Sequence, residues 1–215
     1  MKVRRRVIVF ARVPELGQVK TRLAADLGAD AALAIYRSLA EHTLAVARGV
    51  PECEIEVRYT PAEGADIIAR WLGADLLLRP QGGGDLGMRM HQAVTEAFQD
   101  GIAAVAVIGT DCPSLAMDVI ERAFEYLENA DVVLGPASDG GYYLIALSAP
   151  HSALFQDIPW SSPETLQRTL AVAHESGLRV ALLEERSDVD TGEDWRQWLS
   201  RSHRTHDTNA KGPRE

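Results

Sequence analysis

Residues 102–109, IAAVAVIG, form an apolar run, and the polar stretch TDCPSL (110–115) follows it directly. A run this continuous is typical of a strand that is covered on both faces in a parallel sheet. The same pattern predicts further strands at 6–11, 54–60, 75–79, 131–136, 142–147 and 178–184. Only 54–60 alternates clearly between apolar and polar residues, which favours a place nearer an edge of the sheet.

Helical periodicity lies between these runs. Residues 30–48 repeat apolar positions at spacings of three and four, with Asp30 as the predicted N-cap and Gly49 just past the end. Thr191 and Asp194 resemble a capping box at the start of a last helix. Other helical patterns cover 64–72, 87–99, 116–128, 162–175 and 191–199. Strands that alternate with helices predict a layered α/β fold with a mostly parallel sheet.

Size and charge limit the classes of protein that fit this sequence. A chain of 215 residues suits one domain, which we place at 1–200, and the polar stretch 201–215 is predicted to be a flexible tail. The formal net charge of -9 argues against a nucleic-acid partner. No apolar run approaches the roughly 20 residues of a membrane span. Two cysteines make no disulfide framework, so we expect a cytoplasmic protein that does not bind membranes.

Charged residues follow several of the predicted strands. Lys20 and Arg22 come after the first strand, and acidic residues follow three others, at Asp111, Asp139, Asp188 and Asp190. Ligands of open α/β sheets bind beyond the carboxyl ends of the strands. Carboxylates gathered there repel one another unless a cation joins them, and hard oxygen ligands favour Mg²⁺ or Mn²⁺.

The basic residues predict that the ligand carries phosphate. Lys20 and Arg22 would meet phosphate charge that the metal leaves unneutralised. Gly17 and the glycines at 82–84 would let the backbone approach the ligand closely. The predicted nucleotide-binding residues are Arg12, Gly17, Lys20, Arg22, Gly84 and Asp85. Taken singly, each of these elements also fits a solvated helix face, a helix cap or a turn.

Three other motifs do not fit. GQVKT (17–21) differs from a P-loop because Val19, not glycine, precedes the lysine. GGGDLG (82–87) lacks the spacing and the context of a dinucleotide-binding fingerprint. Cys112 has no histidine at a convincing partner position, and Asp111 beside it disfavours a thiolate, so we do not expect covalent catalysis.

Six motifs in order resemble the DUF2064 family: FARVPELGQVKTRLA, GDLGMRM, GTDCPSL, GPASDGGYYLIAL, IPWSSPET and DVDTGED. Members of that family are labelled transferase 1, associated with radical-SAM and selenodomain genes, or glycosyltransferases resembling 2-phospho-lactate guanylyltransferases. The resemblance runs from about Val7 to Asp194. It implies the GT-A fold of the nucleotide-diphospho-sugar transferase superfamily, a three-layer α/β/α arrangement with a mostly parallel mixed sheet.

The resemblance also implies roles for residues. Lys20 and Arg22 match positions that hold phosphates in related nucleotidyltransferases, and Asp111 matches the metal-binding acidic residue after the fourth strand. Pro113 stands where an Asp-x-Asp motif would have its second acidic residue, so DCP is instead similar to the Asp-x-Pro of molybdenum-cofactor and lactate-type nucleotidyltransferases. Asp188 or Asp190 looks like a second metal ligand or a base on the acceptor side.

Two enzymatic functions remain open. In glycosyl transfer, a nucleoside-diphosphate-sugar is the donor, and Asp139, beside Gly140 and Gly141, binds the sugar or deprotonates a small-molecule acceptor. In nucleotidyl transfer, a phosphorylated acceptor attacks a nucleoside triphosphate, and metals bridge Asp111 and Asp190. We expect glycosyl transfer, with Asp139 and Asp190 as catalytic residues and Gly140, Gly141, Trp160 and Asp188 facing the acceptor. A nucleotide-binding module without catalysis is the third alternative.

Overall fold

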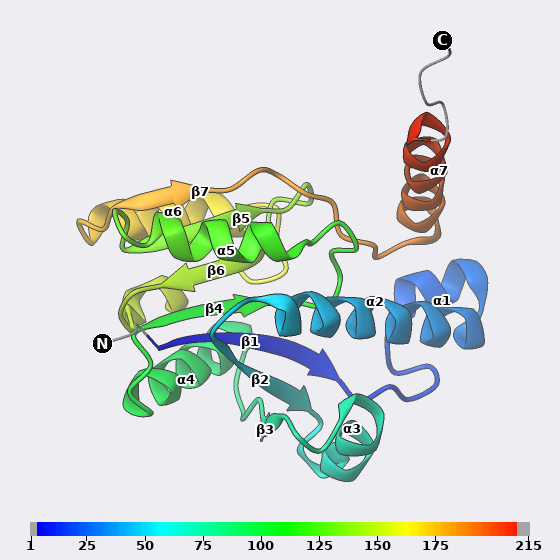
Figure 1. Ribbon diagram of the computed structural model, residues 1–215, viewed down its shortest axis with the longest axis horizontal. Coiled ribbons are helices and arrows are strands. Elements are labelled where there is room, and N and C mark those ends of the chain that lie inside the picture. Colours follow the sequence, from blue (N-terminus) through cyan, green and yellow to red (C-terminus); the bar gives the residue numbers. More distant parts are fainter. Residues whose placement is uncertain (1–3, 210–215) are drawn as a thin grey trace.

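A seven-stranded sheet forms the centre of the molecule, seen in a computed structural model that describes residues 4–209 and side chains as far as Arg201 (Figure 1). The strand order is β3-β2-β1-β4-β6-β5-β7. Neighbouring strands run parallel except β6, which is antiparallel to both β4 and β5. The strands are β1 (Arg5–Arg12), β2 (Cys53–Thr60), β3 (Leu77–Pro80), β4 (Ala104–Ile108), β5 (Val132–Pro136), β6 (Tyr142–Leu147) and β7 (Val180–Leu182). The predicted mixed, mostly parallel sheet is confirmed.

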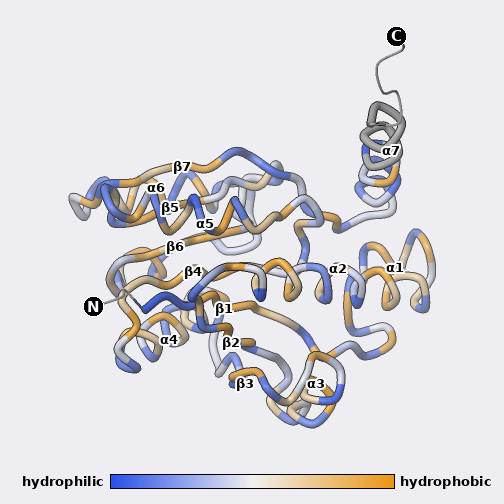
Figure 2. Tube along the Cα trace, in the orientation of Figure 1, coloured by the Kyte–Doolittle hydropathy of each residue, from blue (hydrophilic) through white to orange (hydrophobic). Residues whose placement is uncertain are grey.

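Helices cover both faces of this sheet. One face packs against α2 (Ala29–Gly49), α3 (Ala65–Leu72) and α5 (Met117–Tyr126). The other packs against α4 (Leu86–Gln99), α6 (Thr165–Glu175) and the short helix η2 (Ser152–Phe155). Figure 2 shows hydrophobic residues along the central strands, as expected for strands buried on both sides. The remaining helices are α1 (Thr21–Leu27), η1 (Ala62–Gly64) and α7 (Gly192–Asn209).

The start and end of α2 differ from the prediction. Helix α2 begins at Ala29 after Gly28, so Asp30 lies in the first turn rather than at the N-cap, and Gly49 is its last residue. Gly28 has φ 88° and also ends the preceding helix α1. A chain that passes between two helices within one residue needs this left-handed backbone, which glycine adopts without strain. Asp30 still interacts favourably with the helix dipole from the first turn.

The capping box at α7 is confirmed. Asp194 Oδ2 accepts a hydrogen bond from the Thr191 amide at 2.8 Å, and the Asp194 amide donates to Thr191 Oγ1 at 3.2 Å. Helix α7 continues to Asn209, so residues 201–209 of the predicted tail have a helical backbone, and 210–215 lie outside the described residues. None of the described helices is both long and apolar enough to cross a bilayer.

Strand β2 contains polar residues that are buried rather than solvated. Glu56 is fully buried and Arg58 is 1% exposed, and the two form an ion pair. Arg6 on β1 donates to Glu56 at 3.0 Å, and Arg58 donates to Glu96 on α4 at 2.6 Å. The alternation of 54–60 therefore reflects a buried charge network beneath α4. The strand lies one place from the edge strand β3.

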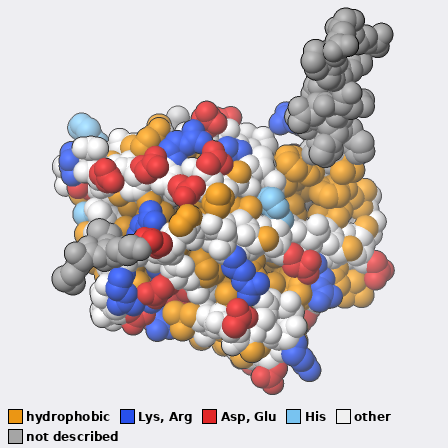
Figure 3. All heavy atoms as spheres, in the orientation of Figure 1, with side chains coloured by type: hydrophobic (Ala, Val, Ile, Leu, Met, Phe, Trp, Pro, Cys, Tyr) orange, Lys and Arg blue, Asp and Glu red, His pale blue; other side chains and the backbone are white. Residues whose placement is uncertain are grey.

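Surface charge is mixed on the face shown in Figure 3, where acidic and basic side chains are interspersed. The net charge of -9 is thus not gathered into one patch on this face. Figure 1 shows α1 and α7 at the side of the molecule toward which the arrows of β1 and β4 point.

Candidate active site

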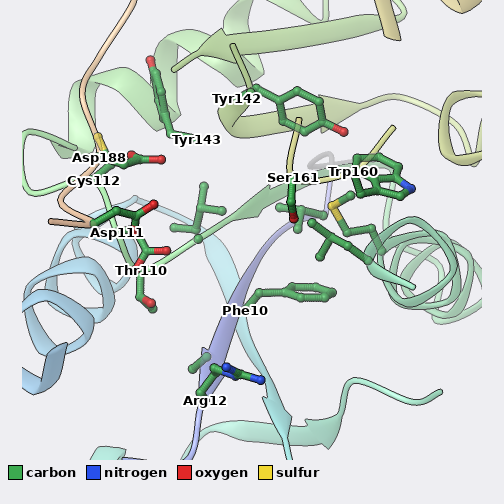
Figure 4. A pocket seen from close by; sticks show the side chains of 18 of the residues that line it. Phe10, Arg12, Thr110, Asp111, Cys112, Tyr142, Tyr143, Trp160, Ser161 and Asp188 are labelled. Atoms are coloured by element: carbon green, nitrogen blue, oxygen red, sulfur yellow. The ribbon is translucent and has the colours of Figure 1, made fainter. Parts of the chain in front are cut away.

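A cavity of about 620 Å³ opens at the carboxyl ends of β1 and β4 and beside β6. Its wall is built from the loops that follow β1, β4, β5 and β7 and from the segment before α6. Figure 4 shows Asp111, Asp188 and Cys112 on one side and Phe10, Tyr142 and Trp160 on the other. The cavity thus joins an ionic side to an aromatic side.

Lys20 joins two acidic residues on the ionic side. Its Nζ lies 2.7 Å from Asp111 Oδ1 and 2.7 Å from Asp190 Oδ1. The Lys20 side chain is 6% exposed, whereas each carboxylate is 43% exposed. One ammonium therefore neutralises part of the charge of two carboxylates that open to solvent.

The backbone holds these three residues in place. Lys20 has φ 48° and ψ 51° at the N-cap of α1, a left-handed conformation that is strained for a residue with a side chain. The Val189 amide donates to the Asp111 carbonyl at 2.9 Å, which joins the loops after β4 and β7. Asp194 accepts from the Asp190 amide at 3.1 Å. The three charged groups thus have backbone support from α1, β4 and α7.

The surroundings favour the charged form of Lys20 but disfavour the charged form of Asp188. Burial lowers the pKa of Lys20, but Asp111 and Asp190 outweigh it, so that the net shift is upward and the amine stays charged. Burial, with repulsion from Asp111 and then Asp139, raises the pKa of Asp188 to about 7. Asp188 Oδ1 is buried and has no hydrogen-bond partner among the described residues. The part of the cavity that holds Asp111, Asp139 and Asp188 therefore carries more negative charge than the nearby basic groups neutralise.

Asp188→Asn is expected to stabilise the protein in EDTA, and more at pH 8 than at pH 5. The unfolded Asp188 carboxyl loses its proton near pH 4, while the folded one keeps it to about pH 7, so this group costs stability as pH rises between those values. We expect the gain in unfolding free energy to be larger at pH 8 by about 1 kcal/mol or more. Urea unfolding at both values measures it, with Asp118→Asn on the surface as the control. An equal gain in unfolding free energy at pH 5 and at pH 8 would contradict the raised pKa of Asp188.

The aromatic side of the cavity comes from β1, β6 and the loop before α6. Tyr142 and Trp160 meet edge to face with ring centroids 6.3 Å apart. Phe10 is partly buried and packs against the same core cluster as these two residues. Ser161 has φ 60°, and Figure 4 shows its side chain directed into the space between the two sides. Strained backbone at a cavity wall is frequent at ligand-binding positions.

Most of the predicted site residues line the cavity, namely Arg12, Lys20, Arg22, Asp111, Asp139, Gly141, Trp160, Asp188 and Asp190. Gly17, Gly84, Asp85 and Gly140 do not. Asp85 caps α4 by accepting from the Met88 amide at 2.8 Å. A Cβ on Gly140 would lie 2.2 Å from the Pro163 carbonyl oxygen, so Gly140 lets the segment before α6 pack closely. Asp85 and Gly140 therefore support the cavity wall rather than face the cavity.

Sequence reasoning missed Tyr36 as a cavity residue. Its hydroxyl accepts from the Arg12 amide at 2.6 Å and donates to the Arg12 carbonyl at 2.8 Å, which fixes the end of β1. Burial raises the pKa of Tyr36 to about 12. In the sequence this residue is one apolar position of a long helical repeat, and no signal separates it from core residues. Burial also raises the pKa of the Cys112 thiol, in agreement with its rejection as a nucleophile.

The described residues contain no group of three or more His, Cys, Asp or Glu side chains arranged to hold a metal. The carboxylates of Asp111 and Asp190 nevertheless converge on one cation, the Lys20 ammonium. Two carboxylates suit Mg²⁺, which completes its coordination with water and substrate phosphate oxygens. Asp188, whose buried Oδ1 has no hydrogen-bond partner among the described residues, adds to the negative charge that a cation would neutralise here.

The profile of a family described as uncharacterized proteins conserved in bacteria, DUF2064, matches residues 43–162. The chain belongs to the DUF2064 family. A Desulfovibrio desulfuricans G20 protein, provisionally named a nucleotide-diphospho-sugar transferase, is 33% identical to this DUF2064 protein with a TM-score of 0.82. The match covers 87% of this chain and 82% of that one. No curated protein matches the chain.

More distant structures share the fold of this DUF2064 protein. CMP:2-keto-3-deoxy-manno-octonic acid synthetase complexed with CTP is 11% identical, with a TM-score of 0.60 over 94% of this chain and 99% of that one. Rv0371C from Mycobacterium tuberculosis, in complex with manganese, is 14% identical, with a TM-score of 0.55 over 92% and 98%. The fold is therefore the nucleotide-diphospho-sugar transferase type that the motifs implied.

Proposed function

We propose that this DUF2064 protein is a divalent-metal-dependent transferase that binds the diphosphate or triphosphate of a nucleotide donor. The observation that carries the proposal is the convergence of Asp111 and Asp190, each with one oxygen 2.7 Å from the Lys20 ammonium, at the edge of one cavity. At the carboxyl ends of the strands, the carboxylates suit a divalent cation and the basic side chains suit the phosphates that it accompanies. The 33% identical Desulfovibrio protein supports a nucleotide-sugar donor.

Acidic and basic residues of the cavity would bind different parts of the nucleotide donor and its metal. Asp111 and Asp190 would hold Mg²⁺ or Mn²⁺, which when bound neutralises charge on the diphosphate leaving group. Lys20, Arg22 and Arg12 line the same cavity and would contact the phosphate oxygens. Basic side chains that are already in position before the reaction stabilise the negative charge that develops on the leaving group, because they do not have to reorganise.

Glycosyl transfer is the reaction that we propose first. Asp139 lines the cavity, and its Oδ1 accepts from the Gly141 amide at 2.9 Å, which orients the carboxylate. Asp139 would take the proton of an acceptor hydroxyl while that oxygen bonds to the sugar carbon and the nucleoside diphosphate leaves. Trp160, with Tyr142 edge-on to it, offers a flat apolar surface on which the acceptor would lie.

A single observation favours nucleotidyl transfer as the second candidate. Asp111 is followed by Cys112 and Pro113, so the loop after β4 offers one carboxylate instead of the pair of an Asp-x-Asp motif. In this reaction the phosphate of an acceptor attacks the α-phosphorus of a nucleoside triphosphate, and pyrophosphate leaves. The same cavity residues would bind the triphosphate.

Product analysis tests the proposal and separates the two reactions. Thermal shift with Mn²⁺ across ATP, CTP, GTP, UTP, UDP-sugars and GDP-sugars ranks the donors. Release of a nucleoside diphosphate from the ranked donor, in the presence of a library of acceptors, supports glycosyl transfer, whereas pyrophosphate release supports nucleotidyl transfer. Binding without turnover by any acceptor would favour a non-catalytic module. Absence of any shift with Mn²⁺ present would contradict the proposal as a whole.

A further inference from the structure

The Lys20 ammonium lies where a metal bound by Asp111 and Asp190 would share its ligands. Its Nζ is 2.7 Å from one oxygen of each carboxylate, and the side chain is almost entirely buried. A divalent cation needs the same carboxylate charge at about 2.0–2.6 Å. An ammonium and a divalent cation at one pair of oxygens repel each other strongly. An ammonium that stays at these oxygens therefore opposes the binding of a metal to them.

The length and flexibility of the Lys20 side chain allow its ammonium to move away from the carboxylates. Its ammonium is carried on a flexible four-carbon stem, so the charge can move while the Cα stays in place. The residue occupies a strained left-handed backbone position, and the neighbouring loop residues 15–18 are exposed. The cavity beside it is also lined by Arg12 and Arg22, toward which a phosphate chain would draw the amine.

We propose that Lys20 competes with the divalent cation for Asp111 and Asp190, and that metal binding releases its ammonium to the nucleotide phosphates. Lys20 is thereby an internal counter-ion in the metal-free protein and a phosphate ligand in the loaded one. Metal and nucleotide then bind with positive coupling, because each favours the released position of Lys20. The inference rests on the proposed function, since it needs the metal at these two residues.

Mn²⁺ titration followed by electron paramagnetic resonance tests the competition without nucleotide or turnover. We expect Lys20→Met to bind Mn²⁺ about tenfold more tightly than the wild type, because the charge-assisted contacts no longer have to be broken. Lys20→Gly should do the same, and it also removes the strain of the left-handed position. Similar gains in both variants assign the effect to the ammonium. Either variant suffices if the other does not fold by circular dichroism.

Arg22→Met is the matched control. Arg22 lines the same cavity, and among the described residues it forms no ion pair. Its removal takes away one positive charge without freeing Asp111 or Asp190, so we expect less than a threefold change in Mn²⁺ affinity, about the scale of an exposed charge effect. If Arg22→Met raises Mn²⁺ affinity as much as Lys20→Met does, the competition is overturned, because the loss of any one positive charge near the cavity would then explain both results.

Calorimetry with CTP and with UDP, each with and without Mn²⁺, completes the test. Mn²⁺ should raise nucleotide affinity by a larger factor in the wild type than in Lys20→Met. Mn²⁺ binding that is unchanged or weaker in both Lys20 variants overturns the competition and leaves the proposed function standing. Failure of the wild type and all variants to bind Mn²⁺, with or without nucleotide, overturns both.

Discussion

Asp111→Asn is expected to weaken Mn²⁺-dependent nucleotide binding by about 100-fold or more while the protein stays folded. Substitutions of residues that only support metal ligands already cost about 10- to 100-fold in metal affinity, and the loss of a ligand charge costs at least as much. The side chain is 43% exposed, and asparagine keeps its shape. Lys20 keeps Asp190 as a partner at 2.7 Å. Calorimetric titration with the donor ranked first by thermal shift measures the change.

Asp118→Asn is the control for Asp111→Asn. Asp118 is an exposed acidic residue on α5 that pairs with Arg122 and does not line the cavity. It should bind nucleotide like the wild type. EDTA should bring wild-type affinity down to that of Asp111→Asn and change the variant little. An Asp111→Asn protein with unchanged affinity in Mn²⁺ would remove Asp111 from the proposed metal site.

Glu56→Gln is expected to lower the free energy of unfolding by about 3 kcal/mol, because it leaves two buried guanidinium groups short of a carboxylate. Arg6 and Arg58 are 3% and 1% exposed, and both pair with Glu56. For a chain of this size the loss corresponds to a fall in Tm of about 6–12 °C. Differential scanning calorimetry and urea unfolding measure both quantities. Arg6 keeps its pairs with Glu54 and Asp100, and Arg58 keeps its pair with Glu96, so the expected loss lies near the low end of the range for buried pairs.

Two comparisons make the Glu56→Gln result specific. Glu175→Gln removes an exposed carboxylate that lies 3.6 Å from Arg168, and it should cost less than about 1 kcal/mol. Adding Arg58→Met to Glu56→Gln should recover part of the loss, since the uncompensated charge is then removed as well. If Glu56→Gln and Glu175→Gln have equal effects, the network beneath α4 contributes little to stability.

Much of the fold was predictable because strands buried on both faces must be apolar throughout. The run 142–147 coincides with β6, and the run 102–109 contains β4, which spans Ala104–Ile108. Helix α1 was missed because its seven residues are too few to display a helical period. Strand β2 was predicted nearer an edge from its alternating residues, and it lies next to the edge strand β3. The burial of Glu56 and Arg58 with each other was not predictable from the alternation.

The candidate site was predictable in part for a different reason. Residues that follow strands in an α/β sheet meet at one edge, so Lys20, Asp111 and Asp190 could be grouped from their places in the sequence. Asp85 and Gly140 follow the same rule in the sequence, yet they cap a helix and allow close packing instead of lining the cavity. Position after a strand does not determine which way a side chain points.

Local patterns of hydrophobicity are enough to predict the alternation of strands and helices and the gathering of charged residues at strand ends. No local pattern predicts that one ammonium joins Asp111 and Asp190, because these residues lie on loops far from Lys20 along the chain, and the contact depends on the tertiary structure. The tertiary structure also places Phe10, Tyr142 and Trp160 across one cavity from Asp111 and Asp188. Such contacts depend on strand order, here on β6 pairing between β4 and β5, and strand order is set by the packing of the whole chain.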